Sequence, residues 1–379
     1  MNQFQRKIKI CCFCESWESG GIESFLNNVL HQIDLDRLQV DIVVCCLKPS
    51  IFTEPLQEIG VRFFELSGNQ KRLIQNHQAF LALIKKEQYD VVHLNVFQGL
   101  SLYYAKLAKQ AGVSIRIVHS HNTDLRKSST KLVKLLIHKV CRELYSKFAT
   151  DFWACSKSAA EFLFSHKVLV KNGFHFIPNG IEIKRFKFNN DVRKIVRKEL
   201  GIENKFVIGS IGRLCYQKNQ EFILDVLSEI KKEGIESCVL FIGEGENLKM
   251  LQKKARNMGI EDSVIFYGTS QQVEELLWAM DLFVFPSRFE GFGIVVVEAQ
   301  AAELSVLCST NVPIEAIVTK HAIRLEISKG AGIWAKTILQ LKETNWDLQA
   351  DKIGIEKFDI QEVSKKIQRE WVKHLCQAK

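Results

Sequence analysis

Residues 282–299 read LFVFPSRFEGFGIVVVEA, and this stretch decides the fold. It begins with an apolar run rich in aromatic and β-branched residues, which is typical of a buried strand. A loop broken by Gly291 and Gly293 follows, and a second apolar run then predicts a helix. A strand that ends in a glycine loop and leads into a helix is the repeating unit of α/β proteins. It presents free backbone N–H groups where the helix begins.

Two carboxylates stand eight positions apart in this stretch: Glu290 in the loop and Glu298 inside the predicted helix. Together with the positive end of the helix dipole, they suit a polyhydroxylated ligand that carries a phosphate. The same pair also fits a solvated loop glutamate followed by a surface helix glutamate. The residues alone leave both interpretations open.

The length and composition limit the classes of protein. At 379 residues the chain is long for one core, so we expect two domains. The formal charge of +9 is spread along the chain. It does not predict nucleic-acid binding, although it suits an anionic membrane surface or a phosphorylated ligand. The 11 cysteines lie mostly in apolar runs, and we recognise no signal peptide or membrane span. We therefore expect a cytoplasmic protein with reduced thiols.

Short apolar runs alternate with helical stretches along the whole chain. The predicted strands are 8–13, 40–46, 61–64, 91–94, 115–119, 152–155, 174–177, 206–212, 238–242, 264–267, 282–286 and 305–308. Continuous apolar runs favour strands buried on both faces of a parallel sheet. The sequence therefore predicts an α/β fold with two Rossmann-like, doubly wound domains facing a cleft. We expect the break between them in residues 182–204, and ligands beyond the carboxyl ends of the strands.

Glycines and histidines follow two predicted strands in the first half. Gly20 and Gly21 open a helix after the first strand, without the G-x-G-x-x-G pattern of dinucleotide-binding enzymes. They either let the backbone approach a ligand or form a plain tight turn. His119 and His121 end the fifth strand. They serve either as structural rings or as a general base or substrate donors; metal ligation is disfavoured because no carboxylate or third histidine completes a set.

Residues 126–147 combine seven basic residues with a single acid, Glu143. Leucine and valine recur among them at helical spacing, which predicts a basic amphipathic helix. Such a helix either lies on an anionic membrane surface or packs on the core with a solvated basic face. The first interpretation would place the protein at the inner face of the cell membrane.

Cations follow the first strand of the second half. Gly212-Arg213-Leu214 ends that strand, and Gln217-Lys218-Asn219 begins the next helix. Arginine forks onto phosphate oxygens and lysine adds a point charge, so this loop suits a diphosphate. Gly243 lies in a permissive turn after the following strand.

In their order and spacing, these segments resemble the retaining GT-B glycosyltransferases. The resemblance is to the family-4 group, which builds bacterial capsule, exopolysaccharide and lipopolysaccharide chains. It spans nearly the whole chain. It rests on Gly20-Gly21-Ile22-Glu23, His119-Ser120-His121-Asn122, Ile177-Pro178-Asn179-Gly180-Ile181, Gly212-Arg213-Leu214, Gln217-Lys218-Asn219 and the pair Glu290/Glu298.

The resemblance implies an organisation and an activity. Residues 1–183 would bind the acceptor, residues 184–358 would bind the nucleotide-sugar donor, and residues 359–379 would form a helix crossing back to the first domain. The enzyme would move a sugar from a UDP- or GDP-sugar to a glycan or lipid-linked glycan with retention of configuration, without a metal or other cofactor.

The family pattern also implies roles for single residues. Arg213 and Lys218 would hold the diphosphate and stabilise its departing charge, Glu290 would face the transferred sugar, and Glu298 would accept hydrogen bonds from the ribose. One histidine, for which we favour His121, would contact the sugar. The remaining donor-binding residues implied are Gly20, Gly21, His119, Gly212, Asn219, Gly243, Phe292, Gly293 and Ile294.

The chain departs from the family pattern where the last predicted strand begins. Where the family usually has Gly-x-Pro-Val, this chain has Glu303 and Ser305 in place of the glycine and the proline. Donor contacts in that loop are therefore not carried over.

Two alternatives keep the fold but change the function. One is a GT-B-type nucleotide-sugar epimerase, which needs several acid and base groups around one sugar; beyond the histidine pair, we find none near Glu290. The other is a non-catalytic partner subunit, against which the presence of Arg213, Lys218, Glu290 and Glu298 argues.

Overall fold

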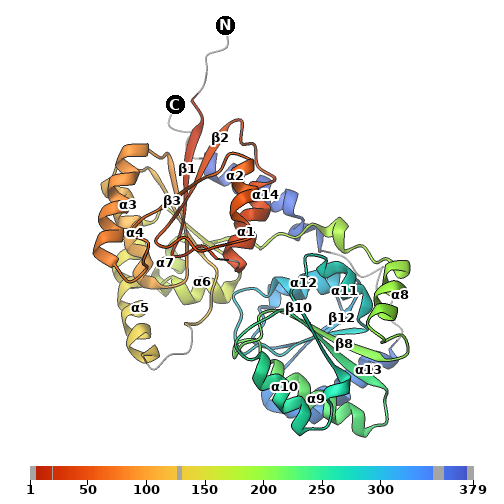
Figure 1. The fold of residues 1–379 in the computed structure, drawn as a ribbon. Coiled ribbons are helices and arrows are strands. Elements are labelled where there is room, and N and C mark those ends of the chain that lie inside the picture. The colour runs from red at the N-terminus through yellow and green to blue at the C-terminus, as the bar shows by residue number, and fades with distance from the viewer. Residues whose placement is uncertain (1–5, 19, 126–129, 345–353, 374–379) are drawn as a thin grey trace. The chain divides into compact units, whose positions relative to one another are not determined.

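The computed structural model describes residues 6–18, 20–125, 130–344 and 354–373 (Figure 1). The chain divides into two compact units. The N-terminal unit comprises residues 1–180 and 358–379, and the C-terminal unit comprises residues 181–357. These limits differ from the expected segments by three residues at the first boundary and by one at the second.

The N-terminal unit is built on a seven-stranded parallel sheet in the order β3-β2-β1-β4-β5-β6-β7. The strands are β1 (Ile8–Cys14), β2 (Leu38–Val44), β3 (Arg62–Glu65), β4 (Val91–Val96), β5 (Ile115–Ser120), β6 (Asp151–Ala154) and β7 (His175–Phe176). The order reverses between β1 and β4. This reversal is the switch point at which doubly wound sheets bind ligands.

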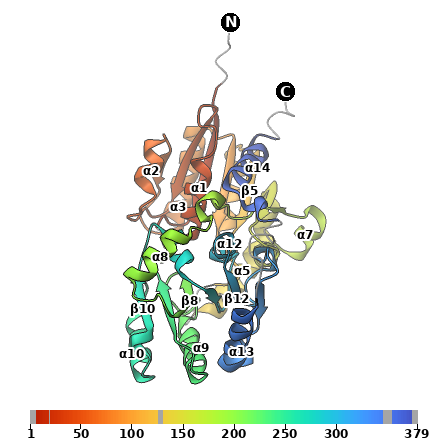
Figure 2. The ribbon, with the colours of Figure 1, turned by 90° about the vertical axis from the view of Figure 1, so that its right-hand side faces the viewer.

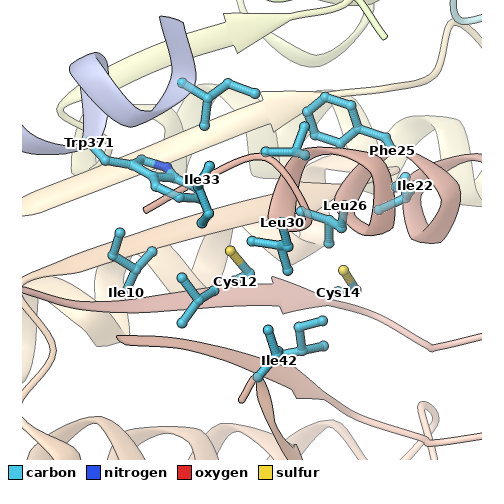
Figure 3. Packing of buried hydrophobic residues seen from close by; sticks show 14 of the residues in the cluster. Ile10, Cys12, Cys14, Ile22, Phe25, Leu26, Leu30, Ile33, Ile42 and Trp371 are labelled. Carbon is cyan, nitrogen blue, oxygen red and sulfur yellow. The ribbon is translucent and has the colours of Figure 1, made fainter. Parts of the chain in front are cut away.

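Helices cover both faces of this sheet (Figures 1 and 2). They are α1 (Gly21–Leu30), α2 (Thr53–Glu58), α3 (Leu73–Glu87), α4 (Tyr103–Gln110), α5 (Lys131–Tyr145), α6 (Lys157–Leu163), α7 (His166–Asn172) and α14 (Ile360–Val372). Side chains of β1 alternate between the faces. Cys12 and Cys14 join a core with α1 and α14 (Figure 3), whereas Phe13 packs on Phe80 and Tyr104 of α3 and α4.

The C-terminal helix α14 completes the N-terminal unit. Trp371 is fully buried in the core that β1 and α1 form (Figure 3). Lys366 Nζ donates to Phe176 O at 2.8 Å, which ties the helix to the edge strand β7. The resemblance implies a helix in residues 359–379; it is observed from Ile360 to Val372, and residues 374–379 lie outside the described part of the chain.

The C-terminal unit repeats the winding with a six-stranded parallel sheet in the order β10-β9-β8-β11-β12-β13. The strands are β8 (Phe206–Ile211), β9 (Ser237–Ile242), β10 (Val264–Gly268), β11 (Leu282–Phe285), β12 (Ser305–Ser309) and β13 (Ala322–Leu325). Its switch point lies between β8 and β11. The predicted α/β fold with two Rossmann-like sheets is confirmed, and all twelve predicted strands end within two residues of their observed ends.

One strand was missed. β13 is only four residues long, carries Arg324 and lies at the edge of the sheet, paired with β12 alone. An edge strand needs no continuous apolar run, so its sequence lacks the pattern that marks the buried strands.

Helices again cover both faces of the second sheet (Figures 1 and 2). They are α8 (Asn190–Glu199), α9 (Gln220–Lys232), α10 (Leu248–Asn257), α11 (Val273–Ala279), α12 (Ile294–Ala301) and α13 (Gly330–Glu343). The core includes Ile208 of β8, Leu227 of α9 and Trp334 of α13. None of the described helices is long and apolar enough to cross a membrane.

The placement of the domain break in residues 182–204 is wrong in one respect. This stretch belongs to the C-terminal unit, and it forms the 3-10 helix η3 (Ile183–Phe186) and then α8. The Asn189 side chain caps α8 at the backbone N–H groups of residues 191 and 192. Arg193 and Arg197 of α8 both pair with Asp281, which precedes β11. The polar character of the stretch reflects an amphipathic surface helix and its ion pairs.

Candidate functional site

The switch point of the C-terminal unit brings two predicted site residues into direct contact. Lys218 precedes α9, and Glu290 lies in the loop after β11, 72 positions away. Lys218 Nζ donates to Glu290 Oε1 at 2.6 Å, and the ammonium also lies 4.7 Å from the centre of the Phe285 ring. The Ser287 hydroxyl donates to the same carboxylate oxygen. A buried carboxylate is thereby held by one charged and one neutral donor.

The loop that carries Lys218 is fixed by a second loop beneath it. Leu214 N donates to Glu244 O at 2.9 Å, and Asn247 N donates to Leu214 O at 3.0 Å. A Cβ atom on Gly243 would lie 2.4 Å from Gly212 O, and Gly243 has a φ of +124°. Both observations require glycine there. The structure therefore gives Gly243 a packing reason, while its donor contact stays a prediction.

Asn219 also has a structural task. It adopts a left-handed conformation with a φ of 58° and is almost fully buried at the start of α9. Its Nδ2 donates to Pro286 O at 3.1 Å, which joins the β8 loop to the end of β11. Asparagine is one of the few residues other than glycine that tolerate this backbone region. A direct contact of Asn219 with the donor remains a prediction.

The Arg288 guanidinium links the loop that carries Lys218 to the loop that carries Glu290. Arg288 lies 4.2 Å from the centre of the Tyr216 ring, donates to Tyr216 O at 2.7 Å, and pairs with Glu221 at 2.8 Å. Gln217 Nε2 returns a hydrogen bond to Phe289 O at 2.9 Å. These contacts tie the Lys218 loop to the Glu290 loop. Arg288 was not among the predicted site residues, because its partners lie about 70 positions away in the sequence.

The Arg213 side chain is more exposed than that of Lys218 and is held by fewer close contacts. Its side chain is 60% exposed and has only a long contact of 3.9 Å to Glu246, itself exposed. Arg213 O accepts from Gln220 Nε2 at 3.0 Å, so the backbone is anchored while the guanidinium is not. An exposed arginine on an anchored loop can reorient towards a phosphate.

The glycine loop ends in the left-handed Gly293, which precedes α12 with a φ of 81°. No side chain caps this helix. Phe292 is buried, and Ile294 is partly exposed at the first helical position. The geometry presents the backbone at the start of α12, as the sequence predicts; contact of residues 292–294 with a sugar stays a prediction.

Glu298 lies one turn into α12 and is partly buried. Burial raises the pKa of its carboxyl group to about 7; the charge of Arg185 lowers this pKa and that of Glu274 raises it further. Within the described residues, no hydrogen bond reaches the Glu298 carboxylate. The side chain is thus available to accept hydrogen bonds from a ligand.

The predicted histidines of the N-terminal unit belong to a cluster of stacked rings at the ends of β4 and β5. His119 is fully buried, with its ring centre 3.9 Å from that of His121 and 5.4 Å from that of His93. His121 is only half-buried, and its Nε2 donates to Asn95 Oδ1 at 2.9 Å. Burial lowers the pKa of His121 and that of His93 to about 3, and it also lowers the pKa of His119. All three rings are neutral near pH 7.

The sequence analysis missed His93 and Asn95 of this cluster. Both side chains are fully buried in β4, whose sequence is otherwise apolar. Two polar residues two positions apart on one face of an apolar strand are a signal that could have found them.

The glycine pair after β1 is organised by Glu23. Its carboxylate accepts from Glu18 N at 3.1 Å, and a Cβ on Gly20 would lie 2.7 Å from Glu23 Oε2. No atom lies within 4 Å of a Cβ on Gly21. Gly20 therefore makes room for this carboxylate, whereas no contact requires glycine at the exposed position 21; a donor contact of either glycine stays a prediction. Ser19 lies outside the described residues.

At the switch point of this sheet, Glu15 after β1 meets the loop after β4. Ser101 Oγ and Gln98 Nε2 donate to its two oxygens. Burial raises the pKa of Glu15. Both of these side-chain partners are neutral, in contrast to the lysine that pairs with Glu290.

Helix α5 lies in the basic segment, and its apolar side chains are not packed in the core as the second interpretation of that segment expects. It packs through His138 and Cys141, whereas its apolar stripe does not enter the core. The exposed apolar side chains are Leu132, Val133, Leu136, Ile137, Val140 and Leu144. His138 Nδ1 accepts from Gly99 N, and its Nε2 donates to Phe162 O, each at 2.9 Å. Residues 126–129 of the segment lie outside the described part of the chain.

No group of three or more His, Cys, Asp or Glu side chains in the described parts of the chain has the arrangement of a metal site. The expectation that the reaction needs no metal stays a prediction.

Two family models match the chain, one for each half. Residues 19–185 match Glycosyltransferase Family 4, and residues 192–353 match Glycosyl transferases group 1. The first match contains Gly20, Gly21, His119 and His121. The second contains the pairs Arg213/Lys218 and Glu290/Glu298.

Curated relatives extend over most of the chain. EpsF of Bacillus subtilis (strain 168) is 29% identical over 343 residues, which cover 89% of this chain and 88% of EpsF. The capsular polysaccharide biosynthesis glycosyltransferase CapH of Staphylococcus aureus is 28% identical over 69% of this chain and 71% of its own. The UDP-Gal:alpha-D-GlcNAc-diphosphoundecaprenol alpha-1,3-galactosyltransferase of Escherichia coli is 25% identical over 73% of each chain.

Solved structures share the fold. Anabaena HepE, crystallised with UDP and glucose, aligns with a TM-score of 0.77 and 20% identity over 97% of this chain and 100% of its own. WaaG, a glycosyltransferase involved in lipopolysaccharide biosynthesis, aligns with a TM-score of 0.69 and 14% identity over 95% of this chain and 99% of its own. With both family models and both sheets in agreement, this chain is a glycosyltransferase of the family-4 type with the GT-B fold.

Proposed function

We propose that this glycosyltransferase moves a sugar from a UDP- or GDP-sugar to a glycan or lipid-linked glycan, with retention of configuration, in the synthesis of a cell-surface polysaccharide. The observation that carries the proposal is the Lys218–Glu290 contact at the switch point of the C-terminal unit. Relatives named for capsule synthesis and for transfer to a diphosphoundecaprenol-linked sugar support the acceptor class. A similar fold crystallised with UDP and glucose supports the donor class.

The charges around β8 and β11 suit the departure of a nucleoside diphosphate. When the C1–O bond of the donor sugar breaks, the diphosphate oxygen takes the electron pair. Lys218 lies in a partly buried loop, where its charge stabilises that oxygen more than it would in water. Arg213 supplies a second cation that is free to reorient. These two residues account for catalysis without a metal.

The contacts of Glu290 speak against its use as a nucleophile. One carboxylate oxygen accepts from both Lys218 and Ser287, which lowers its electron density. In the proposed mechanism the acceptor oxygen therefore attacks C1 on the face from which the diphosphate leaves, and the acceptor proton passes to the departing phosphate oxygen. Glu290 orients the sugar. His121, neutral and half-buried, supplies a hydrogen bond to the sugar and carries no charge.

A donor panel tests the proposal. We would incubate the full chain with UDP-glucose, UDP-galactose, UDP-N-acetylglucosamine and GDP-mannose, and follow thermal stabilisation and nucleotide release with and without glycan acceptors. Acceptor-dependent release with a retained anomeric product is the expected result. Release of a free epimer would support the epimerase, and the absence of any stabilisation by every donor would support the non-catalytic subunit.

The exposed stripe of α5 supports an acceptor held at a membrane. Six large apolar side chains on one helix lie next to Lys134, Lys139 and Arg142, and Lys131 pairs with Asp124 at 2.6 Å. An apolar face flanked by lysines and arginines complements anionic lipid headgroups and the acyl layer below them. We therefore propose that residues 130–147 place the enzyme on the inner face of the cell membrane, where a lipid-linked acceptor is found.

Vesicle sedimentation checks this placement. The triple variant Lys131→Glu, Lys134→Glu and Lys139→Glu should lose binding to vesicles containing phosphatidylglycerol, and so should Leu136→Asp. The matched control reverses Lys249, Lys253 and Arg256 on α10, a basic helix whose exposed surface has few apolar side chains. Equal binding of both triple variants, or strong binding of wild type to neutral vesicles alone, would contradict the proposal.

A further inference from the structure

Glu15 lies at the switch point of the N-terminal sheet, directly after β1, and the segment that follows β4 holds its carboxylate. Ser101 Oγ donates to Oε1, and Gln98 Nε2 donates to Oε2 over 3.3 Å. Hydrogen bonds from nitrogen to oxygen are usually about 2.7–3.2 Å long, so Oε2 is held more weakly than Oε1. Glu15 is also partly exposed. Oε2 is therefore the oxygen with the greater remaining capacity to accept a hydrogen bond.

The segment that orients Glu15 is itself fixed by α5. It forms the 3-10 helix η1 (Gly99–Leu102), in which Gly99 N donates to His138 Nδ1 at 2.9 Å. A Cβ atom on Gly99 would lie 2.4 Å from His138 O, so only glycine allows this close approach. Ser101 is buried two positions further along. The donor to Oε1 is thus set in place by the fold, and a ligand would meet a preorganised carboxylate.

The partners of Glu15 restrict the chemistry of a ligand at this point. Ser101 and Gln98 are neutral, and no lysine, arginine or histidine of the residues that the structure describes forms an ion pair with Glu15. A phosphate or carboxylate group would be repelled by a carboxylate that no cation balances. A hydroxyl group, by contrast, donates a hydrogen bond without bringing a charge of its own, and the bond to a carboxylate is stronger than one between neutral groups.

We propose that Glu15 is an acceptor-binding residue, whose Oε2 accepts a hydrogen bond from a sugar hydroxyl group other than the one that is glycosylated. This inference rests on the proposed function and deepens it. Glu15 lies in the unit in which we expect the acceptor, at the edge where a doubly wound sheet binds its ligand. The acceptor sugar then presents a hydroxyl group, not a phosphate or a carboxylate, to the switch point of this unit.

Transfer kinetics of the full chain test the inference, with the donor panel given above and with octyl glucoside, octyl galactoside and octyl N-acetylglucosaminide as acceptors. Glu15→Gln keeps the shape of the side chain and removes its charge. It should raise the acceptor KM about tenfold, as expected for the loss of one hydrogen bond to a charged group. The kcat of transfer, the donor KM and the hydrolysis of donor without acceptor should stay within about threefold of wild type.

The matched control is Glu65→Gln. Glu65 is an exposed glutamate at the end of another strand of the same sheet, β3, and its Oε1 accepts from Leu47 N at 2.9 Å. It thus also orders a loop through a hydrogen bond, but away from the switch point. This variant should leave the KM values of donor and acceptor unchanged.

Deoxy acceptors separate a direct contact of Glu15 from a structural role. Each hydroxyl group of the best octyl glycoside would be removed in turn, except the one that is glycosylated. Removal of the group that donates to Glu15 should raise KM about tenfold in wild type and have little further effect in Glu15→Gln, because that contact is already lost. The other deoxy acceptors should lose the same factor in both proteins.

Three results would overturn the inference. If the effects of Glu15→Gln and of every deoxy acceptor simply multiply, Glu15 only ties β1 to the segment after β4. If kcat falls about 10³-fold at an unchanged acceptor KM, Glu15 is a general base instead. If the wild type hydrolyses a donor but transfers to no glycoside, the inference fails while the donor half of the proposed function stands. If no donor binds or reacts, the proposed function fails first and takes the inference with it.

Discussion

The two sheets have the same winding, yet their switch points carry different chemistry. In the N-terminal unit, Glu15 after β1 meets the neutral donors Ser101 and Gln98 after β4. At the same topological position in the C-terminal unit, Lys218 after β8 meets Glu290 after β11. The next strand ends in neutral histidine rings in the first unit. In the second unit, the helix after β11 carries Glu298, and burial raises the pKa of its carboxyl group to about 7.

This difference separates two tasks. A charged ligand such as a diphosphate needs cations in a setting where water does not screen them. An acceptor alcohol or a sugar hydroxyl needs neutral donors and acceptors, because hydroxyl groups bring no charge to balance. Equal folds therefore do not imply equal sites: the loops after the strands decide which ligand each unit can hold.

The largest expected effect comes from Lys218→Ala. Donor turnover, measured as nucleotide release, should fall by about 10³-fold, because the departing diphosphate loses its buried cation. The free energy of unfolding should also fall by about 2 kcal/mol, because the buried Glu290 carboxylate loses its charged partner. Arg213→Ala, at an exposed position, should affect turnover without this loss of stability.

Lys232→Ala is the matched control, since Lys232 is an exposed lysine at the other end of α9 with a surface partner, Glu229. If the turnover of Lys218→Ala lay within a few-fold of that of Lys232→Ala, Lys218 would have no catalytic role, and the two switch points would not differ in function.

The histidines provide the next test, within the N-terminal unit. His119→Ala should lower the free energy of unfolding by about 3 kcal/mol, because a fully buried ring leaves a cavity among Phe25, His121 and Trp153. His121→Ala should lower it by about 1 kcal/mol and reduce donor turnover about 20-fold, as expected for one hydrogen bond to a sugar. Urea unfolding and nucleotide release distinguish the two. The reverse pattern would assign the sugar contact to His119.

The substitution Glu298→Gln tests how the charge of Glu298 affects stability, because the two proteins should differ in the pH dependence of their free energy of unfolding. The folded pKa of about 7 lies above the ordinary 4.5, so the native state binds this proton more tightly than the unfolded state does. Protonated Glu298 therefore contributes to the stability of the wild type below pH 4.5, and this contribution is lost as the pH rises to 7. Glu298→Gln does not titrate here, so its stability does not fall in this way. It should equal wild type at pH 4.5 and exceed it by about 2 kcal/mol above pH 7.

Urea unfolding at pH 4.5, 6 and 8 measures this difference, provided that the variant is compared with wild type at each pH. A difference that does not change with pH would show that Glu298 is charged without penalty, and the contrast with the neutral N-terminal site would weaken.

The smallest effect concerns backbone strain and should be the same in both units. Glu303 after α12 and Gln88 after α3 adopt left-handed conformations, with φ values of 63° and 54°. Glu303→Gly and Gln88→Gly should each raise the free energy of unfolding by about 0.5–1 kcal/mol, because glycine adopts this region without a Cβ clash. Two-state urea curves of both variants check this. A stabilisation confined to one of them would show that the other side chain makes a compensating contact.

The left-handed Glu303 also explains a departure from the family pattern. The family usually has a glycine at this position, and the structure shows why: the chain leaves α12 through a positive φ. The sequence shows that Glu303 stands where the family has glycine. The backbone conformation at this position, however, depends on how β12 follows α12. Such local geometry is set by packing that no single position encodes.

Much of the fold was predictable because buried parallel strands leave a plain signal. Their side chains are apolar on both faces, so β1, β4, β8 and β11 read as continuous runs. The signal failed where burial was one-sided or partial. The edge strand β13 was missed. The residues of α8 were assigned to the break between the domains, because the polar face of this helix dominates its sequence.

For the site, the sequence by itself supplied the candidate residues: Arg213 and Lys218, Glu290 and Glu298, and His119 and His121 lie in or next to the segments that follow strands, where parallel sheets present their ligand-binding edge. Only the tertiary structure decided how they are paired. It joined Lys218 to Glu290 across 72 positions, buried His119 while leaving His121 partly exposed, and buried the carboxyl group of Glu298 so that its pKa is raised. The physical reason is that hydrogen bonds and charge interactions act over a few ångströms, and the distances between loops arise only when the sheet has assembled.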